Sequence, residues 1–311
     1  MSKSIGIAAL AAAGLMTGLS ASASAETIAL VTINQQALFF NQINDGATAA
    51  AEEAGADLVI FNANNVPSAQ NDAIETYISQ GVDAIILVAI DVNGVKPAIS
   101  QSVAAGIPVI AIDAQIPDGD NETFIGVDNT QAGRDIGQFF VDYVDEEMGR
   151  EATVGIVGAL NSFIQNQRVD GFVEVVEGSG MSIEILNTVD GQNVQDVALA
   201  AAENLMTANP GMDAIYASGE PALIGAVAAV ESQGLTDSVK VFGWDLTAQA
   251  INGIDEGWVV AVVQQDPYGE GVAAVEAAMT LIEGGSVDPI VYIPIDIVTS
   301  ENVDEYRGMF E

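Results

Sequence analysis

The sequence of 311 residues contains no cysteine and no histidine. Without cysteine the chain cannot form disulfides, and it cannot carry a lipid anchor on an N-terminal cysteine. Without histidine, Ser-His-Asp and Cys-His catalysis are excluded, as are histidine-ligated metal sites. Catalysis would have to use carboxylates, lysine, tyrosine or a metal ion bound by oxygen ligands.

Basic residues are also scarce. The sequence has 7 Lys and Arg against 44 Asp and Glu, which gives a formal net charge of −37. Nucleic acid and anionic membrane surfaces would repel such a chain, so we expect neither as a partner. We interpret the excess of acids as a solvated surface suited to a salty exterior, and it disfavours an acidic substrate.

The longest apolar stretch lies within residues 1–25, and no later segment is long and apolar enough to span a membrane. Lys3 precedes an apolar segment at residues 5–19, and Ala23-Ser24-Ala25 has the small-x-small pattern that a signal peptidase needs. The alternative is a membrane anchor, but the segment is shorter than the ~20 residues that span a bilayer. We therefore expect a signal peptide cleaved after Ala25 and an exported, soluble product.

Beyond residue 25, short apolar runs alternate with longer amphipathic runs. This alternation predicts an α/β fold in which helices cover both faces of parallel sheets. The expected strands are 27–32, 57–61, 83–88, 108–112 and 123–126, then 153–157, 182–187, 213–217, 239–244 and 258–263. Expected helices between them include 38–54, 68–80, 94–105, 131–148, 194–208, 221–233 and 268–283.

The two series of strands are similar in sequence, which predicts two lobes built on one plan. The segment 81–87, GVDAIIL, matches 211–217, GMDAIYA, and the apolar run 107–113 matches 239–245. Both of the latter runs end on aspartate, and a carboxylate at the end of a buried strand is costly unless something binds it. Because open parallel sheets bind ligands at the carboxyl ends of their strands, we expect both aspartates in a cleft between the lobes.

The residues that follow the expected strands are rich in amides, carboxylates and aromatic rings. Amides and carboxylates pair with hydroxyl groups, and aromatic faces pack on the C–H faces of a sugar ring. This composition favours a neutral polyhydroxylated ligand. The segments concerned are 34–40, 88–91, 113–115, 128–129, 161–168, 218–220, 244–245 and 264–266.

Several of these segments together give the chain a family resemblance. They are Phe39-Phe40 with Gly46, the run Gly106-Ile-Pro-Val-Ile-Ala-Ile-Asp113, Gly126-Val-Asp-Asn129 with Gly133, Arg168 with Gly171-Phe172, Gly225, and Val241-Phe-Gly-Trp-Asp245. With them the sequence resembles the periplasmic binding proteins of sugar ABC transporters, and the ribose-binding branch in particular. The resemblance covers essentially all of the chain after residue 25.

The resemblance implies two Rossmann-like lobes joined by a hinge of three crossings, near Val127, Gln265 and Pro294. The lobes of such proteins close on the ligand as a hinged trap. After the signal peptide of residues 1–25, the expected division is an N-terminal lobe of 26–127 plus 266–293 and a C-terminal lobe of 128–265 plus 294–311.

The function that the resemblance implies is a periplasmic solute-binding component of an ABC sugar importer. It would bind a monosaccharide or cyclic polyol without chemistry and without a cofactor, act as a monomer, and be recognised in its closed form by a membrane permease. Two alternatives stay open. One is a carboxylate-dependent sugar-processing enzyme with Asp113 and Asp245 as acid and base. The other is a sensory or chemotaxis sugar receptor of the same fold.

The resemblance also implies roles for individual residues. Phe39 and Phe40 correspond to an aromatic platform for the sugar, and Asp113 to a carboxylate that takes two ring hydroxyls. Asp245 corresponds to its partner from the other lobe, and Gln265 to a hinge glutamine that touches the ligand. The alternative for each aspartate is a helix N-cap.

Four further residues are candidate ligand contacts: Asn166, Arg168, Glu220 and Trp244. Arg168 could instead brace the wall of the cleft, and Trp244 could be a packing residue. Ribose binders have arginines where this chain has Ala114 and Asn166, Asn-Asp where it has Gly219-Glu220, and asparagine where it has Val88. The resemblance therefore does not name the sugar.

No motif predicts a metal or a nucleotide. The acidic segment 117–122, PDGDNE, lacks the glycine spacing of an EF-hand loop, and we interpret it as a solvated turn. The sequence has no Walker or GxGxxG fingerprint, so we expect no nucleotide cofactor.

Overall fold

A computed structural model of the chain describes residues 25–35 and 38–310. Apart from Ala25, the predicted signal peptide lies outside this part. Among the helices of the described part, none combines the length and the apolar character that crossing a membrane requires.

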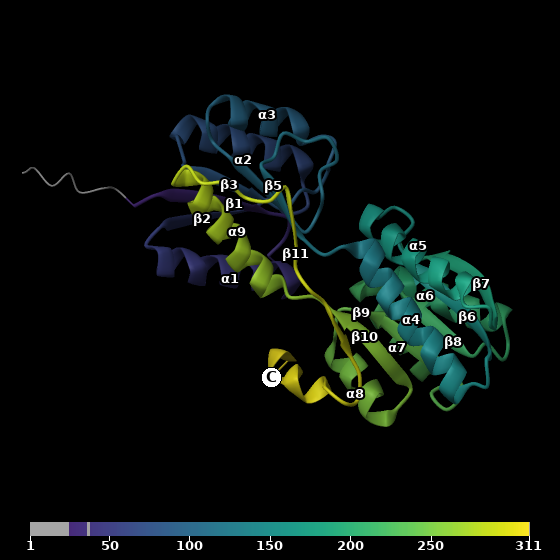
Figure 1. Cartoon of the computed structure of the whole chain (residues 1–311). Helices are drawn as coiled ribbons and strands as arrows, with labels where there is room; N and C mark the ends of the chain where they lie inside the picture. Colours follow the sequence, from purple (N-terminus) through teal and green to yellow (C-terminus); the bar gives the residue numbers. More distant parts are fainter. Residues whose placement is uncertain (1–24, 36–37, 311) are drawn as a thin grey trace, which may run out of the picture.

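The N-terminal lobe contains a six-stranded parallel sheet in the order β11-β5-β4-β3-β1-β2 (Figure 1). One face packs on α1 and α9, and the other packs on α2 and α3. The strands are β1 (Thr27–Thr32), β2 (Asp57–Asn62), β3 (Ala84–Leu87), β4 (Val109–Ile112), β5 (Thr123–Gly126) and β11 (Ile290–Tyr292). The helices are α1 (Leu38–Ala54), α2 (Pro67–Gln80), α3 (Lys96–Ala104) and α9 (Pro267–Ile282).

The C-terminal lobe repeats this plan in a second six-stranded sheet, with the order β12-β10-β9-β8-β6-β7. Its strands are β6 (Glu151–Gly158), β7 (Ser182–Asp190), β8 (Ala214–Ala217), β9 (Lys240–Trp244), β10 (Val259–Gln264) and the antiparallel β12 (Asp296–Val298). Its helices are α4 (Asn129–Glu147), α5 (Phe163–Gly178), α6 (Gln195–Ala208), α7 (Glu220–Ser232) and α8 (Ala248–Glu256), followed by 3₁₀ turns η1 (Val303–Glu305) and η2 (Arg307–Phe310). The predicted α/β fold of two lobes is confirmed. The short strands β11 and β12 were not among the expected ones.

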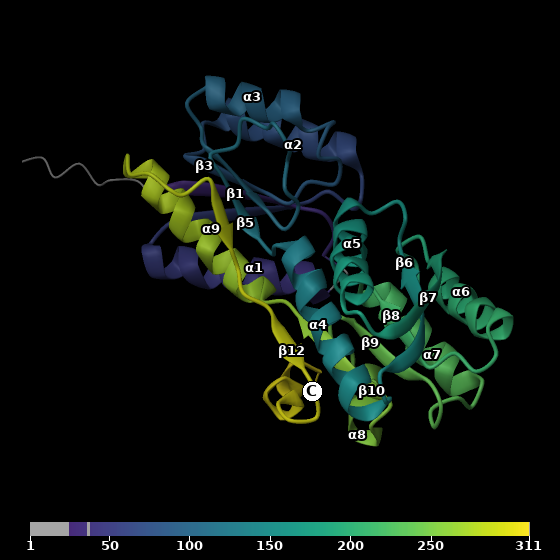
Figure 2. The ribbon, with the colours of Figure 1, turned by 45° about the vertical axis from the view of Figure 1, so that its right-hand side comes forward.

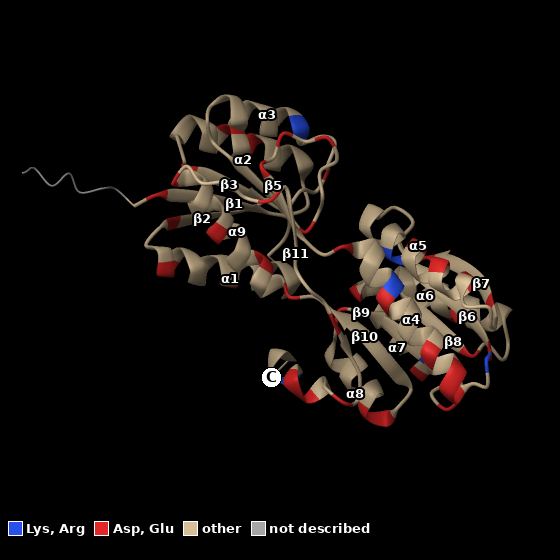
Figure 3. Cartoon of the chain, viewed as in Figure 1, with Lys and Arg blue, Asp and Glu red and all other residues tan. Residues whose placement is uncertain are grey.

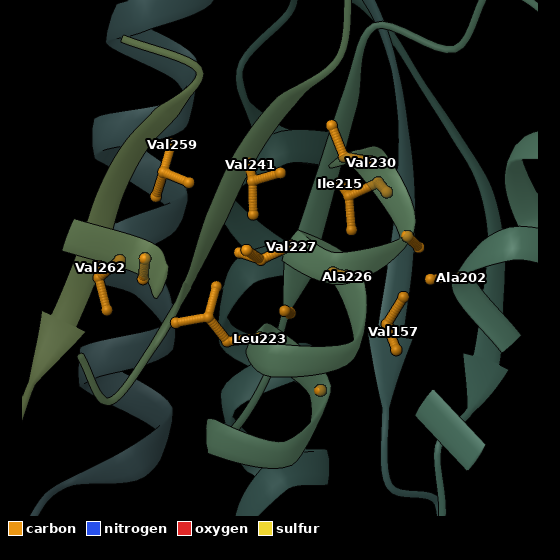
Figure 4. Close-up of a cluster of buried hydrophobic side chains, with 14 of the residues drawn as sticks. Val157, Ala202, Ile215, Leu223, Ala226, Val227, Val230, Val241, Val259 and Val262 are labelled. Atoms are coloured by element: carbon orange, nitrogen blue, oxygen red, sulfur yellow. The ribbon is translucent and has the colours of Figure 1, made fainter. Parts of the chain in front are cut away.

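The core of the C-terminal lobe lies on both faces of its sheet. On one face, α6, α7 and α8 cover apolar side chains such as Val157, Ile215 and Val241, and Leu223 of α7 packs among them (Figure 4). On the other face, α4 and α5 pack around Phe140 and Phe172. Burial on both faces explains why the strands read as continuous apolar runs.

The chain passes between the lobes three times (Figures 1 and 2). It crosses at residues 127–128 between β5 and α4, at 265–266 between β10 and α9, and at 293–295 between β11 and β12. These segments are short and border the carboxyl ends of the strands, so the ends of both sheets face the same space.

Glycines bring one pair of helices in each lobe into close contact. In the N-terminal lobe, a Cβ on Gly46 of α1 would lie 2.1 Å from the carbonyl oxygen of Tyr268 in α9. In the C-terminal lobe, a Cβ on Gly171 of α5 would lie 2.2 Å from the carbonyl oxygen of Thr130 in α4. Only glycine permits these approaches, and they fix the positions of α1 and α5, two of the helices that border the cleft.

Candidate ligand-binding cleft

A cavity of about 390 Å³ lies where the carboxyl ends of the two sheets meet. Side chains that follow strands of both lobes line it, together with the hinge residue Gln265. The lining residues are Asn34, Phe39, Phe40, Asn65 and Asp113 from the N-terminal lobe, and Ser162, Ile164, Gln165, Arg168, Asn193, Gly219, Glu220, Pro221 and Asp245 from the C-terminal lobe. Seven of the nine predicted site residues are among them.

Asp113 and Asp245 occupy equivalent positions in the two lobes. Each directly follows its strand, and each adopts a left-handed backbone, with φ of 61° and 60°. Their backbone N–H groups donate to the next strand, to the carbonyls of Ile125 at 3.0 Å and Val263 at 2.8 Å. Such φ values are uncommon outside glycine and cluster at functional sites. The backbone therefore points both carboxylates to the cavity in the same way.

The alternative that these aspartates cap helices is wrong. The N-cap of α8 is Thr247, whose side chain accepts a hydrogen bond from the N–H of Ala250. The chain after Asp113 leads to strand β5 without an intervening helix.

Burial disfavours the charged form of both aspartates. It raises the pKa of Asp113 to about 6, the nearby Asp245 adds to the rise, and Arg168 opposes it. Burial also raises the pKa of Asp245, against the opposing effects of Arg168 and of a hydrogen bond from Gln265 Nε2 to Oδ1 at 2.8 Å. Donors on a ligand would replace the hydration that these carboxylates lose.

Arg168 is held rigidly at the base of the cleft, with 3% of its surface exposed. Its Nε donates to Asn129 Oδ1 at 2.7 Å, Nη1 donates to the carbonyl of Ser218 at 3.2 Å, and Nη2 donates to Gln265 Oε1 at 3.4 Å. The guanidinium also lies 3.7 Å from the ring centroid of Trp244. Arg168 therefore braces the cleft wall and at the same time borders the cavity.

Trp244 is not among the residues that line the cavity. Its side chain is completely buried, and its Nε1 donates to the Tyr216 hydroxyl at 2.8 Å. The ring lies against the guanidinium of Arg168, and Arg168, unlike Trp244, lines the cavity. The structure thus favours the packing interpretation of Trp244 over a stacking plate for the sugar.

Phe39, Phe40 and Glu220 lie at helix starts around the cavity. The two phenylalanine rings meet edge to face in the first turn of α1, with centroids 5.3 Å apart. Glu220 is the first residue of α7, and burial and the nearby Asp245 raise its pKa. The two rings and Glu220 thus border the cavity from opposite lobes.

Asn166, a predicted ligand contact, does not line the cavity in the structure. Asn166 donates to the carbonyl of Leu160 at 3.1 Å, whereas its neighbour Gln165 lines the cavity. Gln165 Nε2 donates to Asn193 Oδ1 at 2.8 Å, and its Oε1 accepts from Ser218 Oγ at 3.0 Å. Ile164, Gln165 and Arg168 all line the cavity from α5, so their side of the helix is turned to the cleft. Asn166 lies off that side.

Sequence reasoning missed Asn65 and Asn193, which follow the second strand of each lobe. Both have left-handed backbones, with φ of 62° and 57°, and so do their preceding residues Asn64 and Gln192. The signal available in the sequence was an amide pair after each of these strands, because asparagine tolerates this conformation in turns.

Glu270 was also missed, and it lies behind the cleft on α9. Its side chain is fully buried, and neither carboxylate oxygen has a hydrogen-bond partner in the described chain. Burial raises its pKa well above the usual value, and Asp113, Asp266 and Asp245 add to the rise while Arg168 opposes it. Within residues 25–35 and 38–310, no group of three or more acids is arranged to hold a metal ion.

Comparisons with known proteins found a matching family model and similar relatives. A family model described as a periplasmic binding protein domain matches residues 28–286. The ribose import binding protein RbsB of Escherichia coli (strain K12) is 27% identical over 294 residues, which cover 94% of this chain and 97% of that protein. A putative rhizopine-binding protein of Rhizobium meliloti is 28% identical and covers 82% of this chain and 83% of its own length.

Solved structures are similar along the whole described fold. A periplasmic solute-binding protein of Actinobacillus succinogenes with bound D-allose has a TM-score of 0.83 at 26% identity, covering 90% of this chain and 100% of its own. A solute-binding protein of Bacillus halodurans with bound myo-inositol has a TM-score of 0.83 at 25% identity, covering 94% and 100%.

Proposed function

The chain belongs to the periplasmic binding protein domain family, and from this premise we propose that it is the solute-binding component of an ABC importer for a monosaccharide or cyclic polyol. The observation that carries the proposal is the pair Asp113 and Asp245, set at equivalent strand ends on opposite sides of one cavity. Relatives that bind ribose, allose and myo-inositol support this ligand class. Its family members and structural neighbours are transport proteins that bind solutes, and the alternative of a sugar-processing enzyme is not favoured.

In the proposed mechanism, the lobes rotate about the three crossings and close on the ligand. Ligand hydroxyls donate to the carboxylates of Asp113 and Asp245, and these charge-assisted bonds strengthen as closure excludes water. Gln265 is placed to couple the hinge to the ligand, because it accepts from Arg168 and donates to Asp245.

The membrane permease then recognises the closed form, and the protein acts as a monomer in the periplasm. Export would proceed through the signal peptide, with cleavage after Ala25. N-terminal sequencing of the exported protein should begin at Glu26, and any other start would revise the cleavage site.

The positions that depart from the ribose binders bear on the cleft in different ways. Gly219 and Glu220 line the cavity, whereas Ala114 and Asn166 are not in its lining. Neither Ala114 nor Asn166 is a cation, so the arginines of ribose binders have no equivalent charge at these positions. This difference argues against simply transferring ribose from the relatives to this chain.

A thermal-shift screen of pentoses, hexoses and inositols tests the proposal, followed by calorimetry on each ligand that stabilises the protein. A ligand at 100 times its Kd should add about 2.7 kcal/mol to the free energy of unfolding. The Asp113→Ala variant should lose roughly 2 kcal/mol or more of binding free energy, because hydroxyls would lack their charged acceptor.

The exposed Asp237 provides the matched control, since Asp237→Ala removes the same charge on the surface. It should bind as the wild type does. A screen in which no sugar or polyol shifts the melting temperature would overturn the proposal, as would unchanged affinity in Asp113→Ala.

A further inference from the structure

The side chains around the cavity do not balance in charge. Three carboxylates line it, those of Asp113, Glu220 and Asp245, against one guanidinium, that of Arg168. The other lining residues are uncharged, so the lining has a formal charge of −2 when all three acids are ionised. Glu270, buried behind it, adds a fourth carboxyl group without adding a base.

No other base of the described chain supplies the missing positive charge. The five besides Arg168 lie outside the lining. They are Lys96 at the start of α3, Arg134 paired with Glu174 at 2.9 Å, Arg150 paired with Asp145, Lys240 bonded to the Gly257 carbonyl at 2.8 Å, and Arg307 paired with Asp255 at 2.7 Å. Figure 3 colours the basic residues blue along the ribbon, where they are far fewer than the acids. The sequence contains no base between Lys3 and Lys96.

A ligand that offers only hydroxyls would leave this charge uncompensated on closure. Closing the lobes removes water from the carboxylates, and a buried charge without a partner is expensive. With a pKa of about 6, Asp113 stays largely ionised at neutral pH, so protonation of that residue does not remove the imbalance. A ligand that brings a positive charge would balance the lining and would keep Glu220 and Asp245 ionised, although burial raises the pKa of both.

The geometry points to one corner of the cavity for that charge. Phe39, Glu220 and Asp245 line the main cavity and also border a small adjoining space of about 20 Å³. The three side chains therefore converge at this corner. Two carboxylates next to an aromatic ring favour an ammonium group, through ion pairing and cation–π attraction.

We propose that the cleft takes an aminated polyhydroxy ligand, an aminodeoxy sugar or an aminocyclitol, with its ammonium group between Glu220 and Asp245 beside Phe39. The ligand's hydroxyls remain for Asp113 and the amides of the lining. This inference rests on the proposed function, since it names the ligand class of the same site. The net charge of −37 also draws cations toward the protein and should speed their association at low salt.

Calorimetry with matched ligands tests the proposal at about pH 7. Each sugar or inositol of the panel is compared with its aminodeoxy counterpart and with the N-acetylated form, which keeps the bulk and loses the charge. The amine should bind at least about tenfold more tightly than the hydroxyl parent, and acetylation should abolish that gain.

Two variants locate the effect. Glu220→Gln should reduce the ratio of amine to parent affinity toward one, with a smaller change in the affinity of the parent. The exposed Glu231 serves as control, because Glu231→Gln removes the same charge from the surface and should leave the ratio unchanged.

The outcomes separate this inference from the proposed function. If hydroxyl parents bind as tightly as the amines, or more tightly, the inference is overturned and the sugar-binding function stands. A ratio that falls equally in both variants would assign the preference to the overall charge and would also overturn it. If no member of the panel binds in any form, the proposed function fails as well. The comparison of ligands on the wild type does not depend on whether Glu220→Gln folds.

Discussion

Replacing Arg168 with methionine should destabilise the C-terminal lobe in a way that depends strongly on pH. Methionine keeps much of the packing against Trp244 but removes the one cation that lines the cavity in the described part of the chain. Arg168 lowers the pKa of Asp113, Asp245 and Glu270 in the folded protein. Without it, all three folded-state pKa values should rise further.

The expected magnitude follows from the contacts that are lost. The substitution removes the hydrogen bonds at 2.7 and 3.2 Å, and this leaves the oxygens of Asn129 and Ser218 without their donors. The third bond, to Gln265 at 3.4 Å, is long and contributes little. Removing one partner from a buried charged cluster typically costs about 3–5 kcal/mol. We therefore expect Arg168→Met to lower the free energy of unfolding by about 4 kcal/mol at pH ~7.5.

The loss should be smaller in acid. A carboxyl whose folded-state pKa is raised destabilises the fold as pH rises above its unfolded pKa, and it ceases to do so once protonated in both states. Near pH ~5 the folded protein can protonate Asp113, so the loss should shrink by about 1.4 kcal/mol for each pKa unit by which Arg168 lowers the pKa of Asp113.

Urea unfolding followed by tryptophan fluorescence measures this directly. Both tryptophans, Trp244 in β9 and Trp258 beside β10, belong to the C-terminal lobe and report its unfolding. Arg134→Met is the control, because it breaks an exposed pair with Glu174 and should cost at most about 1 kcal/mol. Equal losses for the two variants, or a loss for Arg168→Met that is the same at both pH values, would refute the reasoning.

Two further predictions concern helix packing and the buried acid. Gly171→Ala should destabilise the protein by about 1–3 kcal/mol, because its Cβ would meet the Thr130 carbonyl. Gly178→Ala, in the same helix with nothing within 4 Å, should stabilise it by about 0.5–1 kcal/mol, and denaturant titrations that reverse this order would contradict the close-packing account. Glu270 has a raised folded-state pKa, so wild-type stability should fall as pH rises above the unfolded value near 4.5, and Glu270→Gln should remove part of that fall. Stability curves of equal slope for wild type and Glu270→Gln would show that this carboxyl does not titrate as its burial requires.

Much of the architecture could be predicted from sequence because it depends on local pattern. Alternating apolar runs gave the α/β fold, and the matched segments 81–87 and 211–217 gave the two lobes. Asp113 and Asp245 were identified because each ends a buried strand, and the end of a parallel strand fixes the edge of the sheet on which it lies. Element boundaries and the short strands β11 and β12 were less predictable, since three-residue strands carry little periodicity.

The sequence by itself determined the classes of chemistry that are absent, the repeated fold, and the strand ends that meet at the cleft. Only the tertiary structure decided how those strand ends combine. Arg168 reaches Gln265 across 97 positions of the chain, and its guanidinium, rather than a ligand, covers the ring of Trp244. Residue pattern reports how deeply a side chain is buried, but not which neighbour buries it. For that reason three features emerged only when distant segments were brought together. Gln165 lines the cavity and Asn166 does not, the buried carboxylate of Glu270 has no hydrogen-bond partner in the described chain, and carboxylates outnumber bases in one cavity.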